Sequence, residues 1–120
     1  MHLWRPDREH PLAQNLDEEV DALRGLADAV QALMVAGERV LVIGGSCITA
    51  LGLCAAARRT GTETHLIYID RHLDLNTPSS TTEGSLSWMG MAHALGVDGA
   101  VQELVAVSYT HLTLPTNREV

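Results

Sequence analysis

The sequence predicts an α/β fold in which helices pack against a parallel sheet, and three observations predict it. Two short runs of consecutive apolar residues, 40–43 and 65–69, are typical of strands buried in a parallel sheet. Segments whose apolar residues recur every three or four positions alternate with these runs and predict helices. The chain has 120 residues, of which 46% are hydrophobic, so it has room for one domain with a buried core.

The first predicted helix follows an irregular lead-in over residues 1–14. Asn15 is expected to cap it, and Glu18 stands three positions later, which completes a capping-box pattern. Apolar residues from Leu16 to Met34 then form one stripe at helical spacing. Gly37 is expected to end the helix.

The remaining elements alternate in type. The first predicted strand, 40–43, ends at a sharp Gly44-Gly45 turn, and an Ala- and Leu-rich helix over 48–59 follows and closes at Gly61. The second strand, 65–69, leads into a polar loop over 70–82. A helix over 85–95 and a shorter helix over 97–104 complete the predicted order, which is that of an α/β domain with a parallel sheet.

Residues 107–120 break with everything before them, because they show neither helical spacing nor strand alternation. Residues 107–116 match the translation of a widely used sequencing-library adapter. We therefore predict one domain over residues 1–106 and an adapter-derived tail without a domain over 107–120. In this chain, the native sequence is expected to stop near Val105 or Ala106. The parent protein is expected to continue beyond that point.

Composition excludes several classes of protein. The net charge is −7, whereas a surface that follows nucleic-acid phosphates needs clustered cations. No apolar run reaches the roughly 18 residues of a membrane span, and the polar N-terminus is unlike a signal peptide. Cys47 and Cys54 are predicted to share a helix face but to lie too far apart to bridge. We expect a cytoplasmic protein with two reduced thiols.

Asp70, His72 and Asp74 directly follow the second predicted strand and are the strongest chemical signal. In an extended chain, residues two apart point the same way, so two carboxylates and an imidazole are expected to face one side. Such donors suit Mn²⁺, Fe²⁺ or Zn²⁺. A solvated acidic loop is the alternative, and the pattern alone would leave it slightly ahead. The Gly44-Gly45 turn, at the carboxyl end of the other strand, favours a site.

Three segments, VLVIGGSCITALG, IYIDRHLDLNTP and EGSLSWMGMAHALG, together resemble the arginase, agmatinase and formimidoylglutamase family, the ureohydrolases. The resemblance runs from about Glu38 to Leu95. It implies a three-layer αβα fold with a parallel sheet, of which this chain would hold an incomplete part. It also implies a small-molecule guanidine or amidine substrate, no nucleic-acid or membrane partner, and a homo-oligomer for the full-length protein.

The resemblance assigns roles to the acidic segment. Family members hold two Mn²⁺ ions that share a hydroxide. By position, Asp70 would bridge the two ions, His72 would bind the second and Asp74 the first. These three residues would thus be both metal ligands and catalytic, and Zn²⁺ or Fe²⁺ are alternative ions. Asn76 matches a position that contacts the substrate.

The sequence departs from the family pattern at several positions. Cys47 stands where the family has a histidine ligand, and Ser46 where it has an aspartate. Cys47 is either a thiolate ligand, which would favour zinc, or a small buried residue at a helix start. Glu83 replaces a substrate-contacting serine and Ser87 a proton-shuttling histidine. His93 is out of register, and we expect it on a helix surface.

Two functions follow as hypotheses. The first is a metal-dependent hydrolase of linear guanidine or amidine C–N bonds. It is favoured by the presence of Asp70, His72, Asp74 and Asn76. The second is a non-catalytic family member that binds or regulates, which the replacement of the shuttling histidine favours. The family's second aspartate pair is absent from this sequence, so we expect the chain by itself to be inactive. Whether the parent protein is an enzyme is left open between the two hypotheses.

Overall fold

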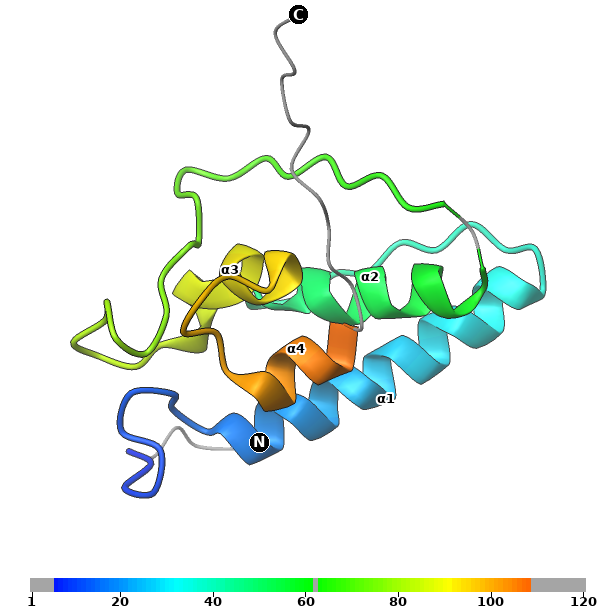
Figure 1. Cartoon of the computed structure of the whole chain (residues 1–120). Coiled ribbons are helices and arrows are strands. Elements are labelled where there is room, and N and C mark those ends of the chain that lie inside the picture. Colours follow the sequence, from blue (N-terminus) through cyan, green and yellow to red (C-terminus); the bar gives the residue numbers. More distant parts are fainter. Residues whose placement is uncertain (1–5, 62, 109–120) are drawn as a thin grey trace, which may run out of the picture.

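The computed structural model describes residues 6–61 and 63–108 (Figure 1). The helices in this part are α1 (Leu16–Val35), α2 (Thr49–Arg59), the 3₁₀ helix η1 (Leu86–Met89), α3 (Gly90–Leu95) and α4 (Gln102–Ser108). The predicted helices over 15–37, 48–59 and 85–95 are confirmed, the last with a 3₁₀ turn at its start. The helix predicted over 97–104 lies later in the chain, as α4. No described helix is long and apolar enough to cross a membrane.

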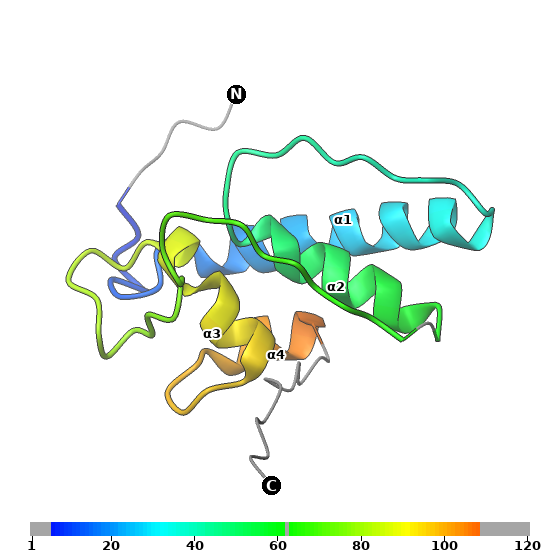
Figure 2. The ribbon, with the colours of Figure 1, turned by 90° about the horizontal axis from the view of Figure 1, so that it is seen from above.

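The two predicted strands are extended segments without strand pairing in the part of the chain that the structure describes. Both run along the same side of the helices, at the top of Figure 1, and they do not lie side by side in Figure 2. Leu41 and Ile43 in the first segment, and Ile67 and Ile69 in the second, are 84–92% exposed. The prediction that these runs are buried strands is therefore wrong for the described residues.

The physical reason is that a strand needs a neighbouring backbone to pair with its N–H and C=O groups. A continuous apolar run also needs cover on both faces. Here the helices cover one face only, so Val42 and Tyr68 are half-buried while their neighbours point outward. The helical layer of the predicted fold is observed, and the parallel sheet stays a prediction.

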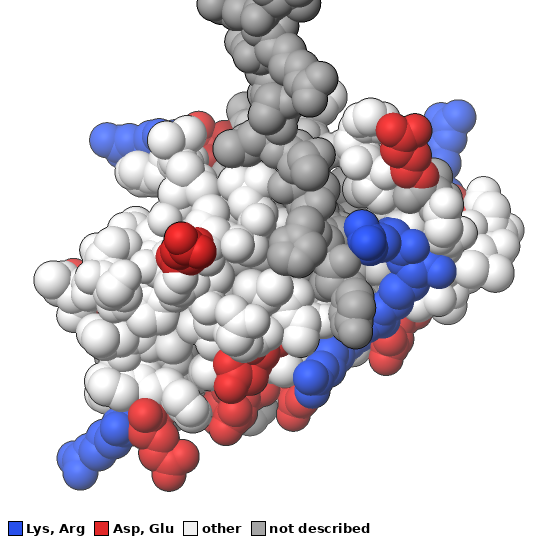
Figure 3. Space-filling view, in the orientation of Figure 1, with Lys and Arg blue, Asp and Glu red and all other residues white. Residues whose placement is uncertain are grey.

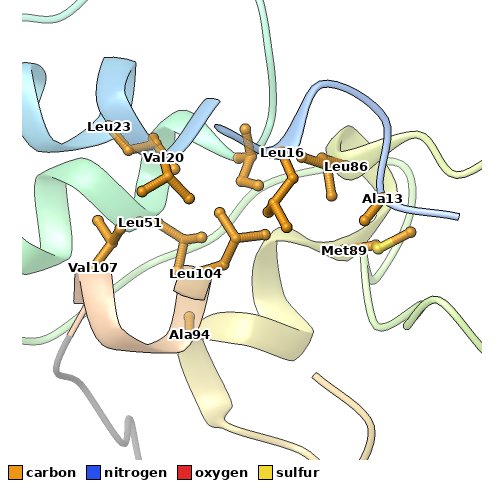
Figure 4. Close-up of a cluster of buried hydrophobic side chains, with 11 residues drawn as sticks. Ala13, Leu16, Val20, Leu23, Leu51, Leu86, Met89, Ala94, Leu104 and Val107 are labelled. Carbon is orange, nitrogen blue, oxygen red and sulfur yellow. The ribbon is translucent and has the colours of Figure 1, made fainter. Parts of the chain in front are cut away.

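The core lies where α1, α2, α3 and α4 meet (Figure 4). Leu51 of α2 and Leu104 of α4 are fully buried, and Met89 closes the cluster from η1. Helices α1 and α2 approach closely at Gly52, where an added Cβ would lie 2.9 Å from a methyl group of Leu26. The cluster consists of small and aliphatic residues and one methionine: Ala13, Leu16, Val20, Leu23, Ile48, Leu51, Leu86, Met89, Ala94, Leu104 and Val107.

The start of α1 differs from the predicted capping box. Asn15 has a left-handed backbone (φ 57°) and its side chain makes no cap hydrogen bond. Instead, the Asp7 carboxylate accepts a hydrogen bond from the Asn15 N–H at 3.1 Å. The lead-in therefore folds back on the helix start, which sequence spacing alone does not encode. The predicted end is confirmed: Gly37 has φ 81°, and the Glu38 N–H reaches the Leu33 carbonyl at 3.0 Å.

Gly84 joins the lead-in to the loop before η1. The Gln14 N–H donates to the Gly84 carbonyl at 2.8 Å, and Gly84 has φ 67°. A Cβ at this position would lie 2.4 Å from the Pro11 carbonyl oxygen, so the turn requires glycine. This contact fixes the loop that carries Glu83 and Ser87.

His93 is fully buried, so its predicted place on a helix surface is wrong. Its Nδ1 donates to the Met89 carbonyl at 2.5 Å, and its Nε2 accepts from the Val101 N–H at 3.0 Å. Because α4 and the turn before it pack on α3, the face that carries His93 is covered by residues later in the chain. Burial lowers the His93 pKa, opposed by the bond to Met89, so the ring is neutral in the folded state.

The predicted boundary at residue 106 falls inside α4. Val107 is 3% exposed within the core, and Ser108 ends the helix. The rest of the predicted tail lies outside the described residues, so the boundary stays a prediction. Most charged side chains of the described residues lie toward the edges of the face seen in Figure 3.

Candidate metal centre

The turn between the first extended segment and α2 carries Cys47. The turn is tight, because a Cβ on Gly44 would lie 3.2 Å from the Thr49 hydroxyl oxygen. Gly90, the first residue of α3, packs against this turn, because a Cβ added to it would lie 3.4 Å from the Cys47 carbonyl oxygen. These contacts hold the backbone of Cys47 just before α2. Cys47 is exposed, so the alternative that it is a small buried residue is wrong.

Cys47, Asp70 and Asp74 form a cluster whose potential ligand atoms all lie within 4.8 Å of one another. The Cys47 Sγ donates to the Asp70 Oδ2 at 3.5 Å. Asp74 is buried, at 4% exposure, and has a left-handed backbone with φ 49°. Its carbonyl oxygen accepts from the Ala92 N–H at 3.1 Å, which anchors the acidic segment to α3. Residues far apart in sequence thereby bring two carboxylates and a thiol together.

His72 lies outside this cluster. Its side chain is 68% exposed, and its Nδ1 lies 4.0 Å from the Asp70 Oδ1. The chain bends at residues 71–72, and Asp74 is left-handed, so the segment is not the extended run from which a shared direction was predicted. The structure brings Asp70 and Asp74 together with Cys47 and turns His72 to a neighbouring cavity.

That neighbouring cavity, of about 250 Å³, is lined by His72, Asp74, Asn76 and Trp88. The Asn76 N–H donates to the Trp88 carbonyl at 3.1 Å, and its side-chain oxygen accepts from the Ser80 hydroxyl at 3.0 Å. The backbone of Asn76 is therefore tied to η1. Asp74 borders both the cluster and this cavity, so the predicted substrate-binding residue lies beside a predicted ligand.

Tyr68 was missed by the sequence reasoning. Its hydroxyl donates to the Asp74 Oδ2 and lies 3.4 Å from the Asp70 Oδ2. The available signal was position: Tyr68 stands two residues before Asp70, so in an extended segment both point to the same side. Burial and the hydrogen bond to Asp74 raise the pKa of Tyr68, so it is a neutral donor.

The charges of the cluster are set by its neighbours. The Asp70 carboxylate has a lowered pKa because the His72 N–H donates to it at 3.0 Å and the Cys47 thiol donates as well. Burial raises the pKa of the Cys47 thiol, as do its hydrogen bond to Asp70 and the charge of Asp74. Without a cation, a neutral thiol therefore donates to an ionised Asp70.

The donor set fits a single divalent cation. Ligand distances of roughly 2.0–2.3 Å place the donors of a four-coordinate ion roughly 3–4 Å apart. The potential ligand atoms of the cluster lie up to 4.8 Å apart, so they would have to approach one another by about 1 Å to share a cation. A shift of the exposed Cys47 side chain can supply this. Two carboxylates and a sulfur suit Zn²⁺, and the carboxylates alone suit Mn²⁺ or Fe²⁺. Among the described residues, three potential ligand atoms lie within 4.8 Å of one another. His72 is the candidate ligand for a second cation.

A second hollow, of about 430 Å³, lies beside Ser46 and Ser87. The hydroxyl oxygens of these serines are 3.2 Å apart. Glu19 and Glu83 also line it, and burial raises the Glu19 pKa. The two serine hydroxyls therefore contact each other at the positions where the family resemblance implies an aspartate and a histidine.

The chain is similar to proteins of one known family. The profile of the arginase family matches residues 7–113. An arginase of Brevibacillus brevis is 38% identical over 81 residues, which cover 68% of this chain and 27% of that protein. Arginase-1 of Sus scrofa is 38% identical over 61 residues, covering 51% of this chain and 19% of its own length.

The described fold is also found in a solved structure. The arginase of Bacillus caldovelox superposes with a TM-score of 0.76 at 26% identity, over 90% of this chain and 35% of that one. The chain thus spans about a quarter to a third of the length of the bacterial relatives it matches. Because the family profile covers most of its length, the chain belongs to the arginase family.

Proposed function

We propose that this chain supplies the first part of the metal centre of a hydrolase that cleaves C–N bonds in linear guanidine or amidine substrates. One observation carries the proposal: Cys47, Asp70 and Asp74 place three potential ligand atoms within 4.8 Å of one another. Membership of the arginase family supports the reaction class. The matched part covers 27% and 19% of two relatives named arginase, so the activity of the whole protein is part of the proposal.

The residues divide the work by position. Asp70 and Asp74 would hold a cation with Cys47, and His72, whose ring lies near the other oxygen of Asp70, would serve a second one. Bound Mn²⁺, or Zn²⁺ or Fe²⁺, would lower the pKa of water and so supply a nucleophile near neutral pH. Asn76, in the wall of the cavity beside Asp74, would orient the substrate. The burial of Asp74 keeps water away from one side of the donor cluster.

This chain alone is proposed to bind one cation, because three potential donors lie together among the described residues. We propose that it does not turn over substrate, because one cation is half of the two-ion centre that the family resemblance implies. We further propose that the protein acts in the cytoplasm, where its unpaired Cys47 and Cys54 would stay reduced. Self-association of the parent protein is part of the same proposal and rests on the family alone.

A non-catalytic binding protein is the second candidate, and the contact between Ser46 and Ser87 favours it. Neither hydroxyl can shuttle a proton near neutral pH as an imidazole does. A protein with these residues could bind a cation and a guanidine without releasing product.

Calorimetric titration of the 120-residue chain with Mn²⁺ and with Zn²⁺ tests the metal site. We expect one cation per chain. Asp74→Asn should weaken binding at least about 100-fold, because it replaces a charged carboxylate ligand with a neutral amide, a larger loss than that of a group that only orients a ligand. Asp21→Asn, on an 83% exposed side chain of α1, is the matched control and should change nothing. Absence of binding, or equal binding by the Asp74 variant, would remove the basis of the proposal.

Catalysis needs a separate assay on a longer protein that contains this sequence. Release of urea from linear guanidines, or of the corresponding amide from linear amidines, abolished by Asp74→Asn, supports the hydrolase. Substrate binding without product, at full cation occupancy, supports the non-catalytic protein.

A further inference from the structure

Tyr68 has no role in the proposed function, yet its hydroxyl touches both carboxylates of the metal cluster. It donates to the Asp74 Oδ2 and lies 3.4 Å from the Asp70 Oδ2. Its flanking residues Ile67 and Ile69 are 85% and 92% exposed, whereas Tyr68 is half-buried. The second extended segment therefore directs one side chain inward at this point, and that side chain ends between the two acids.

The two carboxylates depend on Tyr68 to different degrees. Asp70 also accepts from the His72 N–H at 3.0 Å and from the Cys47 thiol at 3.5 Å. Among the described residues, the Asp74 carboxylate has Tyr68 as its hydrogen-bond donor. Without that hydroxyl, Asp70 would keep its orientation, while the buried Asp74 would lose the contact that aims it at the cluster.

We propose that Tyr68 is a positioning residue that holds the Asp74 carboxylate, beside Asp70, in the arrangement that binds a divalent cation. The inference rests on the proposed metal site and adds to it a residue outside the ligand set. Each carboxylate oxygen has two lone pairs, so the Asp74 Oδ2 can accept from Tyr68 and bind a cation together. Hydrogen bonds that orient ligating carboxylates are a general feature of metal sites, and their loss costs about 10–100-fold in affinity.

Tyr68→Phe in the 120-residue chain tests this role, because it removes the hydroxyl and keeps the ring. We expect Zn²⁺ affinity, measured by calorimetry, to fall about 10–100-fold. Thr81→Ala is the matched control. It removes a hydroxyl that accepts from the Glu83 and Gly84 N–H groups in the same loop, and it should leave the affinity unchanged.

A spectroscopic measurement separates positioning from a merely structural role. Tyr68 and Tyr109 are the two tyrosines of the chain. Zn²⁺ should change the near-ultraviolet tyrosine absorption of the original chain and of Tyr109→Phe, and should leave that of Tyr68→Phe unchanged. The comparison of the original chain with Tyr109→Phe stands even where Tyr68→Phe fails to fold.

The outcomes distinguish the two proposals. If the original chain binds no cation, both fail. If it binds one, and Asp74→Asn weakens binding while a folded Tyr68→Phe binds equally or more tightly, the role of Tyr68 is overturned and the metal site stands. Zn²⁺ binding without a tyrosine signal in Tyr109→Phe overturns it as well.

Discussion

Replacing the buried His93 with leucine should destabilise the chain by an amount that its contacts define. The ring donates to the Met89 carbonyl at 2.5 Å and accepts from the Val101 N–H at 3.0 Å, and it is fully buried. Leucine fills a similar volume but satisfies neither group. Leaving a buried donor or acceptor unpaired costs about 1–3 kcal/mol, so the two groups left unpaired in His93→Leu should together cost roughly 2–6 kcal/mol.

The same residue predicts a pH dependence. Burial lowers the folded-state pKa of His93 below the unfolded value of about 6.5. Above that pH both states are neutral and the stability is complete. As the pH falls below it, the unfolded chain binds a proton that the folded chain refuses. Stability should then decrease by up to about 1.4 kcal/mol per pH unit until the folded pKa is reached.

Urea unfolding at pH 8.0, 6.5 and 5.5 measures both effects. The control is His65→Leu, at a side chain that is 83% exposed. It should keep the stability and the pH dependence of the original chain, while His93→Leu should lose stability at pH 8.0 and show a flatter decrease toward pH 5.5. A His93→Leu variant with unchanged stability, or with the same decrease in acid, would refute the assigned hydrogen bonds.

Three further predictions concern the loops and the extended segments. Gly84→Ala should lose at least about 1–2 kcal/mol in chemical denaturation, because φ is 67° and the new Cβ would meet the Pro11 carbonyl; Gly45→Ala, in open space, should lose far less. Cys47→Ser should weaken Zn²⁺ binding more than Mn²⁺ binding in calorimetry, since the thiolate is the softer donor; equal losses would count against it as a ligand. Ile43→Lys with Ile69→Lys, both 92% exposed, should raise the concentration at which the chain stays monodisperse in light scattering. The free energy of unfolding should change by less than about 0.5 kcal/mol for each of these two substitutions.

The helices could be predicted because their signals are local. The apolar stripe of α1 and the glycines at its end and after α2 act within a few residues, and both Gly37 and Gly61 have the positive φ expected of them. The cap at Asn15 could not be predicted in the same way. The carboxylate of Asp7, eight residues earlier in the sequence, accepts the hydrogen bond from the Asn15 N–H.

The extended segments show where local reasoning ends. An apolar run such as 40–43 identifies a segment that prefers extended backbone, but pairing depends on other strands. In the described residues no such partner is present, and Leu41 and Ile43 remain exposed. Burial of such a run is a property of the assembled sheet.

The members of the candidate site could be predicted only in part, and their geometry could not. The spacing pattern singled out Asp70 and Asp74, and the family resemblance added Cys47; these three residues lie together in the structure. The direction of His72 depends on the bend at residues 71–72, which an extended-chain argument cannot foresee. Tyr68 was missed because a tyrosine inside an apolar run is ordinarily a packing residue.

Crystals of the chain grown with Zn²⁺, with an anomalous difference map recorded at the zinc absorption edge, would show whether Cys47, Asp70 and Asp74 bind a cation together. We expect one strong peak within roughly 2.0–2.3 Å of the Cys47 Sγ and of one oxygen each of Asp70 and Asp74. A map without a peak at this cluster, with zinc bound at exposed groups such as His65 and Glu63 instead, would rule out the proposed metal site.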